Sequence, residues 1–272
     1  MSYIYVNGEI KSHEQAFISV QDLSYQYGEG VFETFRSYEG ECLFIEDHLA
    51  RIEWTCTFLN IDFTPPDLTK IAKELLQKNQ LKDARFKLVV SQANCVVFCD
   101  PLDQSQISKP FKLKTIQNYK NDDGVLATLK TTNYLIKRLA KQEAIDSGFD
   151  DGILLNSKNQ VTETTTGNLF WVNKDGQLKT ILKDCHHLPG IMKKQILGLL
   201  KLHNLKCNEE LISANDFSHA REIFMTNSIV GIKPVILVDH RQISGSEPGN
   251  ITLMIQDLWQ KHLQELIKKE QA

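Results

Sequence analysis

Residues 152–182 read GILLNSKNQVTETTTGNLFWVNKDGQLKTIL, and this stretch decides the fold class. The runs GILLN, VTET, LFWVN and LKTIL predict four strands, and Lys174-Asp175-Gly176 predicts a hairpin turn between the last two. A helical pattern over residues 134–147 comes before this stretch, and one over residues 191–202, opened by Pro189-Gly190, comes after it. Strands and helices mixed in this way predict an α/β or α+β protein with two lobes.

The rest of the chain extends the same mixture. Further strands are predicted in SYIYV (2–6), VFETFRSY (31–38), CLFIE (42–46), FKLVVS (86–91), FKLKTI (111–116), IFMTNS (223–228) and VILVD (235–239). Further helices are predicted over residues 48–59, after Pro65-Pro66-Asp67, and over residues 253–267, with a loop over residues 92–110. The polar stretch Asn121-Asp122-Asp123-Gly124 predicts a boundary between an N-terminal domain, 1–120, and a C-terminal domain, 121–272.

Composition excludes several classes of function. The chain of 272 residues has 31 Lys plus Arg against 34 Asp plus Glu, and this net charge of −3 is too balanced for electrostatic binding of nucleic acid. No apolar run approaches the roughly 18 residues that suggest a membrane span. The start, MSYIYVNGEIKSHEQ, lacks the basic and apolar regions of a secretion signal. The six cysteines follow no disulfide or zinc spacing, so we expect a cytoplasmic protein with reduced thiols and no metal.

Two ionisable residues stand in positions that suit chemistry. Lys130 follows the strand-like run 126–129, where partial burial lowers the pKa of an amine and frees it for Schiff-base formation. Glu163 lies among hydroxyl side chains, and an ionised carboxylate there suits a protonated heterocyclic nitrogen. Each residue taken alone is also explained as a solvated surface side chain.

Two further segments suit an anion. Leu188-Pro189-Gly190-Ile191-Met192 is a turn that opens a helix, and helix starts bind phosphate through free backbone N–H groups. Thr226-Asn227-Ser228 ends a predicted strand and offers hydroxyl and amide groups, although both segments also serve as ordinary turns. Cys185-His186-His187 has no further metal ligands at a suitable spacing and is interpreted as a polar loop.

Together these segments resemble one family. The motifs that carry the resemblance are, in order, Tyr27-Gly28-Glu29-Gly30-Val31-Phe32-Glu33-Thr34, Asp47-His48-Leu49-Ala50-Arg51, Leu129-Lys130-Thr131-Thr132-Asn133-Tyr134-Leu135, Val161-Thr162-Glu163 with Gly167-Asn168-Leu169-Phe170, Pro189-Gly190-Ile191-Met192 and Ile232-Lys233-Pro234-Val235. Over residues 3–260 the chain resembles the class IV (fold type IV) pyridoxal-phosphate enzymes. This family contains D-amino-acid aminotransferases, branched-chain aminotransferases and 4-amino-4-deoxychorismate lyases, so the resemblance implies a D-amino-acid-aminotransferase-like fold and pyridoxal 5'-phosphate as cofactor.

The resemblance also implies roles for single residues. Lys130 matches the lysine that bonds to the cofactor and moves the proton, and Glu163 matches the carboxylate on the ring nitrogen. The other implied cofactor contacts are Arg51 and Ser228 on the phosphate, the backbone amides of Ile191 and Met192 on the same phosphate, Tyr134 on the ring hydroxyl, and Asn168. Tyr27, Phe32 and Thr34 fall on the strand that lines the substrate pocket in this family, in part across the interface of a homodimer.

The subgroup resemblance favours a lyase. Thr34 after Phe32-Glu33, Met192 after Gly190-Ile191, and the segment Thr226-Asn227-Ser228 are similar to the lyase pattern. Gln92-Ala93 replaces an Arg-Gly that is usual in lyases, so Arg85 and Lys87, on one face of their strand, are candidates for receiving a substrate carboxylate.

The predicted function is therefore 4-amino-4-deoxychorismate lyase, which acts on a small amino substrate and releases pyruvate and 4-aminobenzoate for folate biosynthesis. One alternative is a class IV aminotransferase that acts on branched-chain or D-amino acids. A second alternative is a non-catalytic protein that retains the fold.

Overall fold

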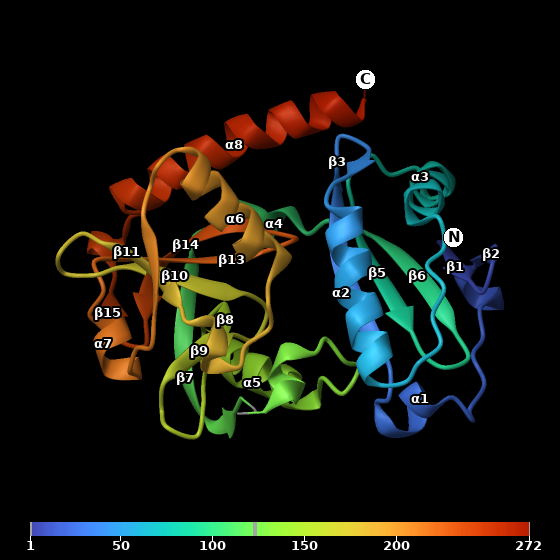
Figure 1. Ribbon diagram of the computed structural model, residues 1–272, viewed down its shortest axis with the longest axis horizontal. Coiled ribbons are helices and arrows are strands. Elements are labelled where there is room, and N and C mark those ends of the chain that lie inside the picture. The colour runs from blue at the N-terminus through green and yellow to red at the C-terminus, as the bar shows by residue number, and fades with distance from the viewer. Residues whose placement is uncertain (1, 122–123, 272) are drawn as a thin grey trace. The chain divides into compact units, whose positions relative to one another are not determined.

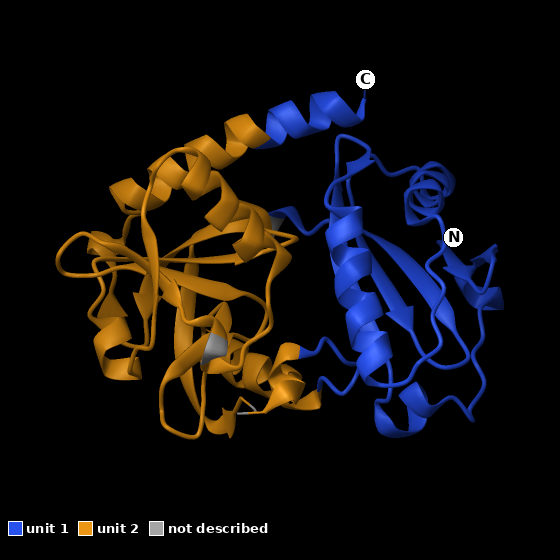
Figure 2. Cartoon of the chain, viewed as in Figure 1, with its two compact units in different colours: residues 1–104, 129–134, 263–272 blue, residues 105–128, 135–262 orange. Residues whose placement is uncertain are grey.

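The computed structural model describes residues 2–121 and 124–271, except for the side chains at 105, 106 and 184. Packing divides the chain into unit 1, which is Met1–Gln104, Leu129–Tyr134 and Leu263–Ala272, and unit 2, which is Ser105–Thr128 and Leu135–His262 (Figure 2). The units are not two consecutive halves of the chain, because residues 129–134 belong to the same unit as the N-terminal part. The predicted boundary between residues 120 and 121 stays a prediction, and its residues Asp122 and Asp123 lie outside the described part.

Unit 1 is built on an antiparallel sheet. In the described residues this sheet has six strands in the order β2-β1-β6-β5-β3-β4. The strands are β1 (Tyr3–Val6), β2 (Glu9–Ser12), β3 (Val31–Tyr38), β4 (Glu41–Cys42), β5 (Ala84–Val90) and β6 (Cys95–Pro101). The helices of unit 1 are η1 (His13–Gln15), α1 (Leu23–Tyr27), α2 (Ile45–Phe58) and α3 (Leu68–Asn79) (Figure 1).

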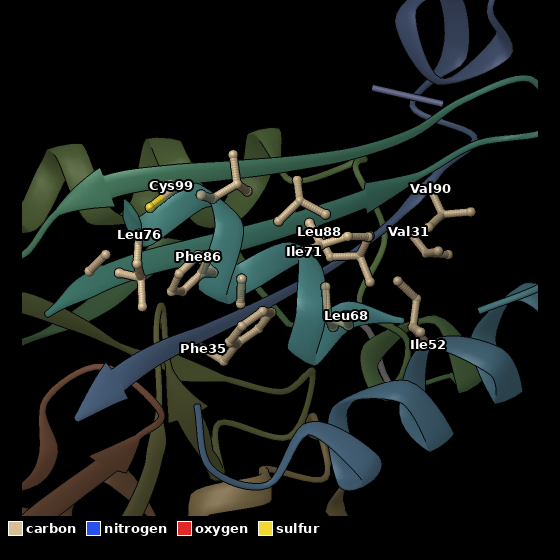
Figure 3. Packing of buried hydrophobic residues seen from close by; sticks show 14 of the residues in the cluster. Val31, Phe35, Ile52, Leu68, Ile71, Leu76, Phe86, Leu88, Val90 and Cys99 are labelled. Carbon is tan, nitrogen blue, oxygen red and sulfur yellow. The ribbon is translucent and has the colours of Figure 1, made fainter. Parts of the chain in front are cut away.

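The core of unit 1 lies between this sheet and α2 and α3. Strand β5 alternates, with Ala84, Phe86, Leu88 and Val90 buried and the residues between them less so. The buried residues pack with the apolar stripe of α3, where Leu68 and Leu75 are 1% and 0% exposed (Figure 3). The opposite face of the sheet is therefore left to the intervening residues of β3 and β5.

Unit 2 holds a second, mixed sheet. Its order in the described residues is β12-β11-β10-β13-β14-β7-β8-β9, with β15 paired to β14. The strands are β7 (Phe111–Lys120), β8 (Asp151–Leu155), β9 (Val161–Thr164), β10 (Asn168–Val172), β11 (Leu178–Ile181), β12 (Cys207–Glu210), β13 (Glu222–Asn227), β14 (Gly231–Val238) and β15 (Arg241–Gln242). The helices are α4 (Gln104–Ser108), η2 (Val125–Thr128), α5 (Leu135–Asp146), η3 (Lys183–Cys185), α6 (Ile191–Leu202), α7 (Ala214–Ser218), η4 (Ser244–Ser246) and α8 (Asn250–Glu270). Helices α4 and α8 each contain residues of both units.

Three local predictions were wrong. The stretch 92–110 is not one loop, because β6 pairs along the whole of β5 and α4 follows it. The predicted strand 42–46 keeps only Cys42, since Phe44 adopts a left-handed φ of 62° and α2 begins at Ile45. The run before Lys130 is the 3₁₀ helix η2 rather than a strand. Where the structure describes the chain, its helices all fall short of the length and apolarity that a membrane crossing requires.

Candidate active site

Lys130 lies in unit 1, beside strand β3. The backbone of the strand holds it there, because the N–H of Phe32 donates to the carbonyl of Lys130 at 2.9 Å and Val31 forms a bridge with Thr131. The Nζ atom of Lys130 is 4.5 Å from the centroid of the Phe32 ring. Tyr134 packs edge-on against the same ring, with centroids 5.3 Å apart. Cation–π attraction and aromatic packing thus fix the amine against Phe32.

A second ammonium group lies against this ring. Lys87 on β5 places its Nζ 4.8 Å from the centroid of Phe32, and it pairs across the strands with Thr34. Phe32, Thr34, Arg85 and Lys87 alternate with the core residues of their strands, so they share the face opposite the core. The side chain of Arg85 is more open to solvent: it is 45% exposed, and its guanidinium group lies 3.9 Å from the carboxylate of Asp100.

Tyr27 is not on this strand, contrary to its predicted place. It ends helix α1 and is 72% exposed, because Gly28 follows with a left-handed φ of 71° and turns the chain before β3 begins. An added side chain at Gly28 would also lie within about 3.0 Å of the backbone of Asn133. The turn therefore needs glycine to bring the segment containing Lys130 close to the start of β3.

Arg51 is bound to a buried carboxylate that the sequence analysis did not single out. Glu33 on β3 is 0% exposed and accepts from Nε and Nη2 of Arg51, both at 2.6 Å. Nδ1 of His48 lies 2.7 Å from Oε2 of the same carboxylate. Burial alone raises the pKa of Glu33, but Arg51 and His48 outweigh it and lower the pKa to about 2. The arginine is thus held in one orientation, and its predicted contact with phosphate stays a prediction.

Glu163 in unit 2 reaches its position through a β-bulge. Leu154 pairs with Glu163 while Leu155 pairs with Val161, so Thr162 is an extra residue on β9. The bulge puts Glu163 on the face of Leu154, which packs against α5, whereas Val161 joins the core on the other face. Glu163 is 2% exposed. Alternation along VTET gives no sign of this change of face.

Two groups hold Oε1 of Glu163. Nζ of Lys137, in the first turn of α5, lies 2.7 Å away, and Nδ2 of Asn121 donates at 3.2 Å. Neither residue lies in a motif of the resemblance, and Asn121 was named only as part of the predicted domain boundary. A signal was nevertheless present in Lys137, which precedes Ala140 and Ala144 by three and seven residues on the buried side of α5.

The start of helix α6 suits an anion. Its N-cap is Gly190, which provides no side-chain cap, so the N–H groups of Ile191 and Met192 begin the helix without a helical acceptor. Asn168 donates to the carbonyl of Leu188 at 2.9 Å and fixes the turn. A Cβ on Gly190 would lie 1.7 Å from Oδ1 of Asn168, so only glycine fits there.

An unsatisfied hydroxyl lies near this turn. Thr226, the cross-strand partner of Asn168, has a buried Oγ1 atom without a hydrogen-bond partner. Asn227 closes the following turn by accepting from the N–H groups of Ile229 and Val230, both at 2.9 Å, and Ser228 lies inside that turn. Helix start, hydroxyl groups and turn together have the donors that a phosphate group requires.

Lys193 in α6 contacts both strand β11 and the loop before the helix. Nζ of Lys193 donates to the carbonyl of Ile181 at 2.6 Å and lies 3.1 Å from Nε2 of His187. Burial, followed by the charges of Lys193 and Lys137, lowers the pKa of His187 to about 3, so this ring is neutral. Among the described residues, no group of three or more His, Cys, Asp or Glu side chains is arranged to hold a metal ion.

Comparison with known proteins identifies the family. The model of the family "Amino-transferase class IV" matches residues 30–238. The protein of Methanocaldococcus jannaschii that is named "Putative branched-chain-amino-acid aminotransferase" is 30% identical over 271 residues, which cover 93% of this chain and 94% of that protein. The aminodeoxychorismate lyase of Bacillus subtilis is 28% identical over 286 residues, which cover 98% and 97% of the two chains.

A solved structure gives the same fold. The branched-chain aminotransferase of Escherichia coli superimposes with a TM-score of 0.86 at 24% identity, covering 94% of this chain and 92% of that one. The predicted mixed α/β fold of fold type IV is thereby confirmed, and so are the predictions of an enzyme and of its cofactor. Branched-chain aminotransferases and aminodeoxychorismate lyase are similar to the chain at comparable identity, so the comparisons support the family and do not by themselves favour the lyase subgroup. The chain belongs to the class IV aminotransferase family, whose enzymes use pyridoxal phosphate.

Proposed function

We propose that the protein is a 4-amino-4-deoxychorismate lyase that uses pyridoxal 5'-phosphate. The observation that carries this proposal is the second ammonium group, Lys87, which lies against Phe32 together with Lys130. The substrate of this reaction carries two carboxylates, and a cation beside the reactive amine suits such a substrate. The aliphatic side chain of a branched-chain amino acid instead requires an apolar wall. Lys87 would take the role of the arginine that is usual in lyases at the position where this chain has Gln92-Ala93.

Separate residues of the chain would hold the cofactor and move the proton. Pyridoxal phosphate, when bound, supplies a ring that withdraws electrons from the carbon next to the substrate amine. Lys130 provides the amine that holds the cofactor and then moves the proton at that carbon. Glu163 would accept a hydrogen bond from the protonated ring nitrogen, and the start of α6 with Ser228 would bind the phosphate. Glu33 already fixes Arg51, so the guanidinium group of Arg51 would lose little side-chain freedom when it binds the phosphate.

A class IV aminotransferase is the second candidate. Its support is the similarity to branched-chain aminotransferases over nearly the whole chain. Lys130 would perform the same proton transfer there, but the reaction would need a second substrate, an oxo acid, to receive the amino group. Met192 and Thr34, which resemble the lyase pattern, and the charge of Lys87 favour the lyase.

We also propose a homodimer. Segment 17–27 of unit 1 exposes Phe17, Val20, Tyr25 and Tyr27 to between 69% and 80% of their surface. Large apolar side chains gathered at this exposure are typical of an interface between subunits. Sedimentation velocity should give a dimer, and Phe17→Ser with Val20→Ser should shift the protein toward the monomer.

The activity is tested by two assays on the same purified protein. Release of 4-aminobenzoate and pyruvate from 4-amino-4-deoxychorismate is expected, and amino exchange that depends on an oxo acid is not. Lys87→Met should raise KM for this substrate about tenfold while the cofactor stays bound, since an ion pair with substrate is lost. Arg85→Met, on the same face but more exposed, is the matched control and should change KM little. Exchange without release would exclude the lyase in favour of the aminotransferase.

A further inference from the structure

We propose that Lys137 is a positioning residue that acts through Glu163 to make the ring nitrogen of the bound cofactor easier to deprotonate. The inference rests on the proposed function, in which Glu163 is the partner of that nitrogen. It concerns a residue of α5 that lies outside every motif of the resemblance. The carboxylate is thus already engaged by a cation of the chain itself.

The fold brings the two residues together. Ala140 and Ala144 bury one side of α5 against Ile116 and Leu154. Lys137 lies on the same side, three residues before Ala140, and so points toward the strands rather than away from them. The bulge at β9 turns Glu163 to the face of Leu154, its cross-strand partner. Without the bulge, alternation would turn the carboxylate away from α5.

The contact is close and largely removed from water. Nζ of Lys137 is 2.7 Å from Oε1 of Glu163, and their side chains are 17% and 3% exposed. Nδ2 of Asn121 shares Oε1, while Oε2 takes part in neither contact. Lys137 therefore fixes the rotation of the carboxylate and leaves Oε2 as the oxygen for the ring nitrogen.

Neighbouring elements bring cations and one paired carboxylate. The contacts place here the Asn121 amide just after β7, His187 in the loop before α6 and Lys193 in α6, while the buried Asp151 of β8 is paired with Lys141, one turn along α5. His187 is neutral, and Lys137 is one of the charges that keep it so. Lys137 is thus a fixed cation next to the acidic partner, and a nearby cation weakens proton binding by any base in its field.

This arrangement predicts a shift in the titration of the bound cofactor. Unit charges several ångströms apart in a protein interact strongly enough to shift a pKa by about one unit. Replacing Lys137 by methionine should therefore raise the pH midpoint of the absorption change of bound pyridoxal 5'-phosphate by about one unit, because that change follows a proton on the conjugated cofactor, which lies in the field of the same charge. Lys137→Arg keeps the charge and should restore the wild-type midpoint.

The experiment compares the holoenzyme with three variants. Absorption spectra are recorded from pH 5 to 10 for wild type, Lys137→Met, Lys137→Arg and the control Lys141→Met. Lys141 is one turn later on α5 and pairs with another buried carboxylate, Asp151, at 3.5 Å. Its removal should leave the midpoint unchanged. The dissociation constant of pyridoxal 5'-phosphate is measured in parallel by equilibrium dialysis as a readout that needs no activity.

The outcomes separate this inference from the proposed function. A wild-type protein without bound chromophore contradicts the function itself. A wild-type chromophore together with an unshifted Lys137→Met midpoint overturns the role of Lys137 alone. If the methionine variant does not fold, Lys137→Gln keeps a donor to Oε1 and loses only the charge, so the same upward shift is expected. An equal shift in Lys137→Arg and Lys137→Gln would also refute the role of charge.

Discussion

Glu33 offers a stability test whose size follows from the structure. Its carboxylate is fully buried and bound to Arg51 at two atoms and to His48. Burial raises the pKa, but these partners outweigh burial and lower the pKa from 4.5 to about 2 in the folded protein. A shift of about 2.5 units corresponds to about 3 kcal/mol of folding stability at neutral pH. Glu33→Gln should therefore lower the free energy of unfolding by about 3 kcal/mol, within the range for breaking a buried ion pair.

The pH dependence of this loss has a definite sign. Because the folded pKa is lowered, the contribution of Glu33 is complete above pH 4.5 and is lost as the pH falls toward 2. Urea unfolding followed by circular dichroism should show a large difference between wild type and Glu33→Gln at pH 7. The difference should shrink below pH 4.5.

A matched control is Glu9→Gln. Glu9 pairs with Lys11 at 2.8 Å, but its side chain is 70% exposed, so the change should alter stability by less than about 0.5 kcal/mol. If Glu33→Gln were as stable as wild type at pH 7, the ion pair would contribute nothing. If the loss at pH 3 equalled that at pH 7, its electrostatic origin would be refuted.

Two further predictions concern the phosphate turn, with a control in the same helix, and Asp22 at the N-cap of α1. Gly190→Ala, whose Cβ would collide with Asn168, should weaken the binding of pyridoxal phosphate at least about tenfold in dialysis. Gly198→Ala in the same helix meets open space and should leave binding unchanged while it stabilises the protein by about 1 kcal/mol. For Asp22, burial raises the pKa but hydrogen bonds from Ser24, Ser91 and Asn94 outweigh it and lower the pKa to about 2. Asp22→Asn should therefore cost about 2 kcal/mol in urea unfolding at pH 7 and less below pH 4; an equal loss at both would rule out the charge.

Regular elements of the fold were predictable because their signals are local. The stripe of α3 and the Pro-Gly start of α6 each lie within one stretch of sequence, and both helices form where predicted. Strand β6 was missed although it forms a local hairpin with β5, in which Val90 pairs with Cys95, and although the run Val96-Val97-Phe98 favours a strand. The 3₁₀ helix before Lys130 was missed for a different reason: an apolar run of four residues fits a strand or a helical turn equally well.

The candidate site was predictable only in its motif residues. Lys130 and Glu163 were named from the resemblance. Glu33, which holds Arg51, and Lys137, which holds Glu163, were not. Glu33 belongs to an apolar strand and Lys137 to the buried side of a charged helix, but no local pattern indicates which charge each of them contacts. The β-bulge at Thr162 has the same character, since two strands define it.

The central claim is that Lys130 carries the cofactor. The most direct test reduces the purified yellow holoenzyme with borohydride, digests it and locates the phosphopyridoxyl group by mass spectrometry. The account predicts the group on Lys130, and it predicts a colourless Lys130→Ala variant. Modification of a different lysine, such as the neighbouring Lys87, or no modification at all, would contradict it.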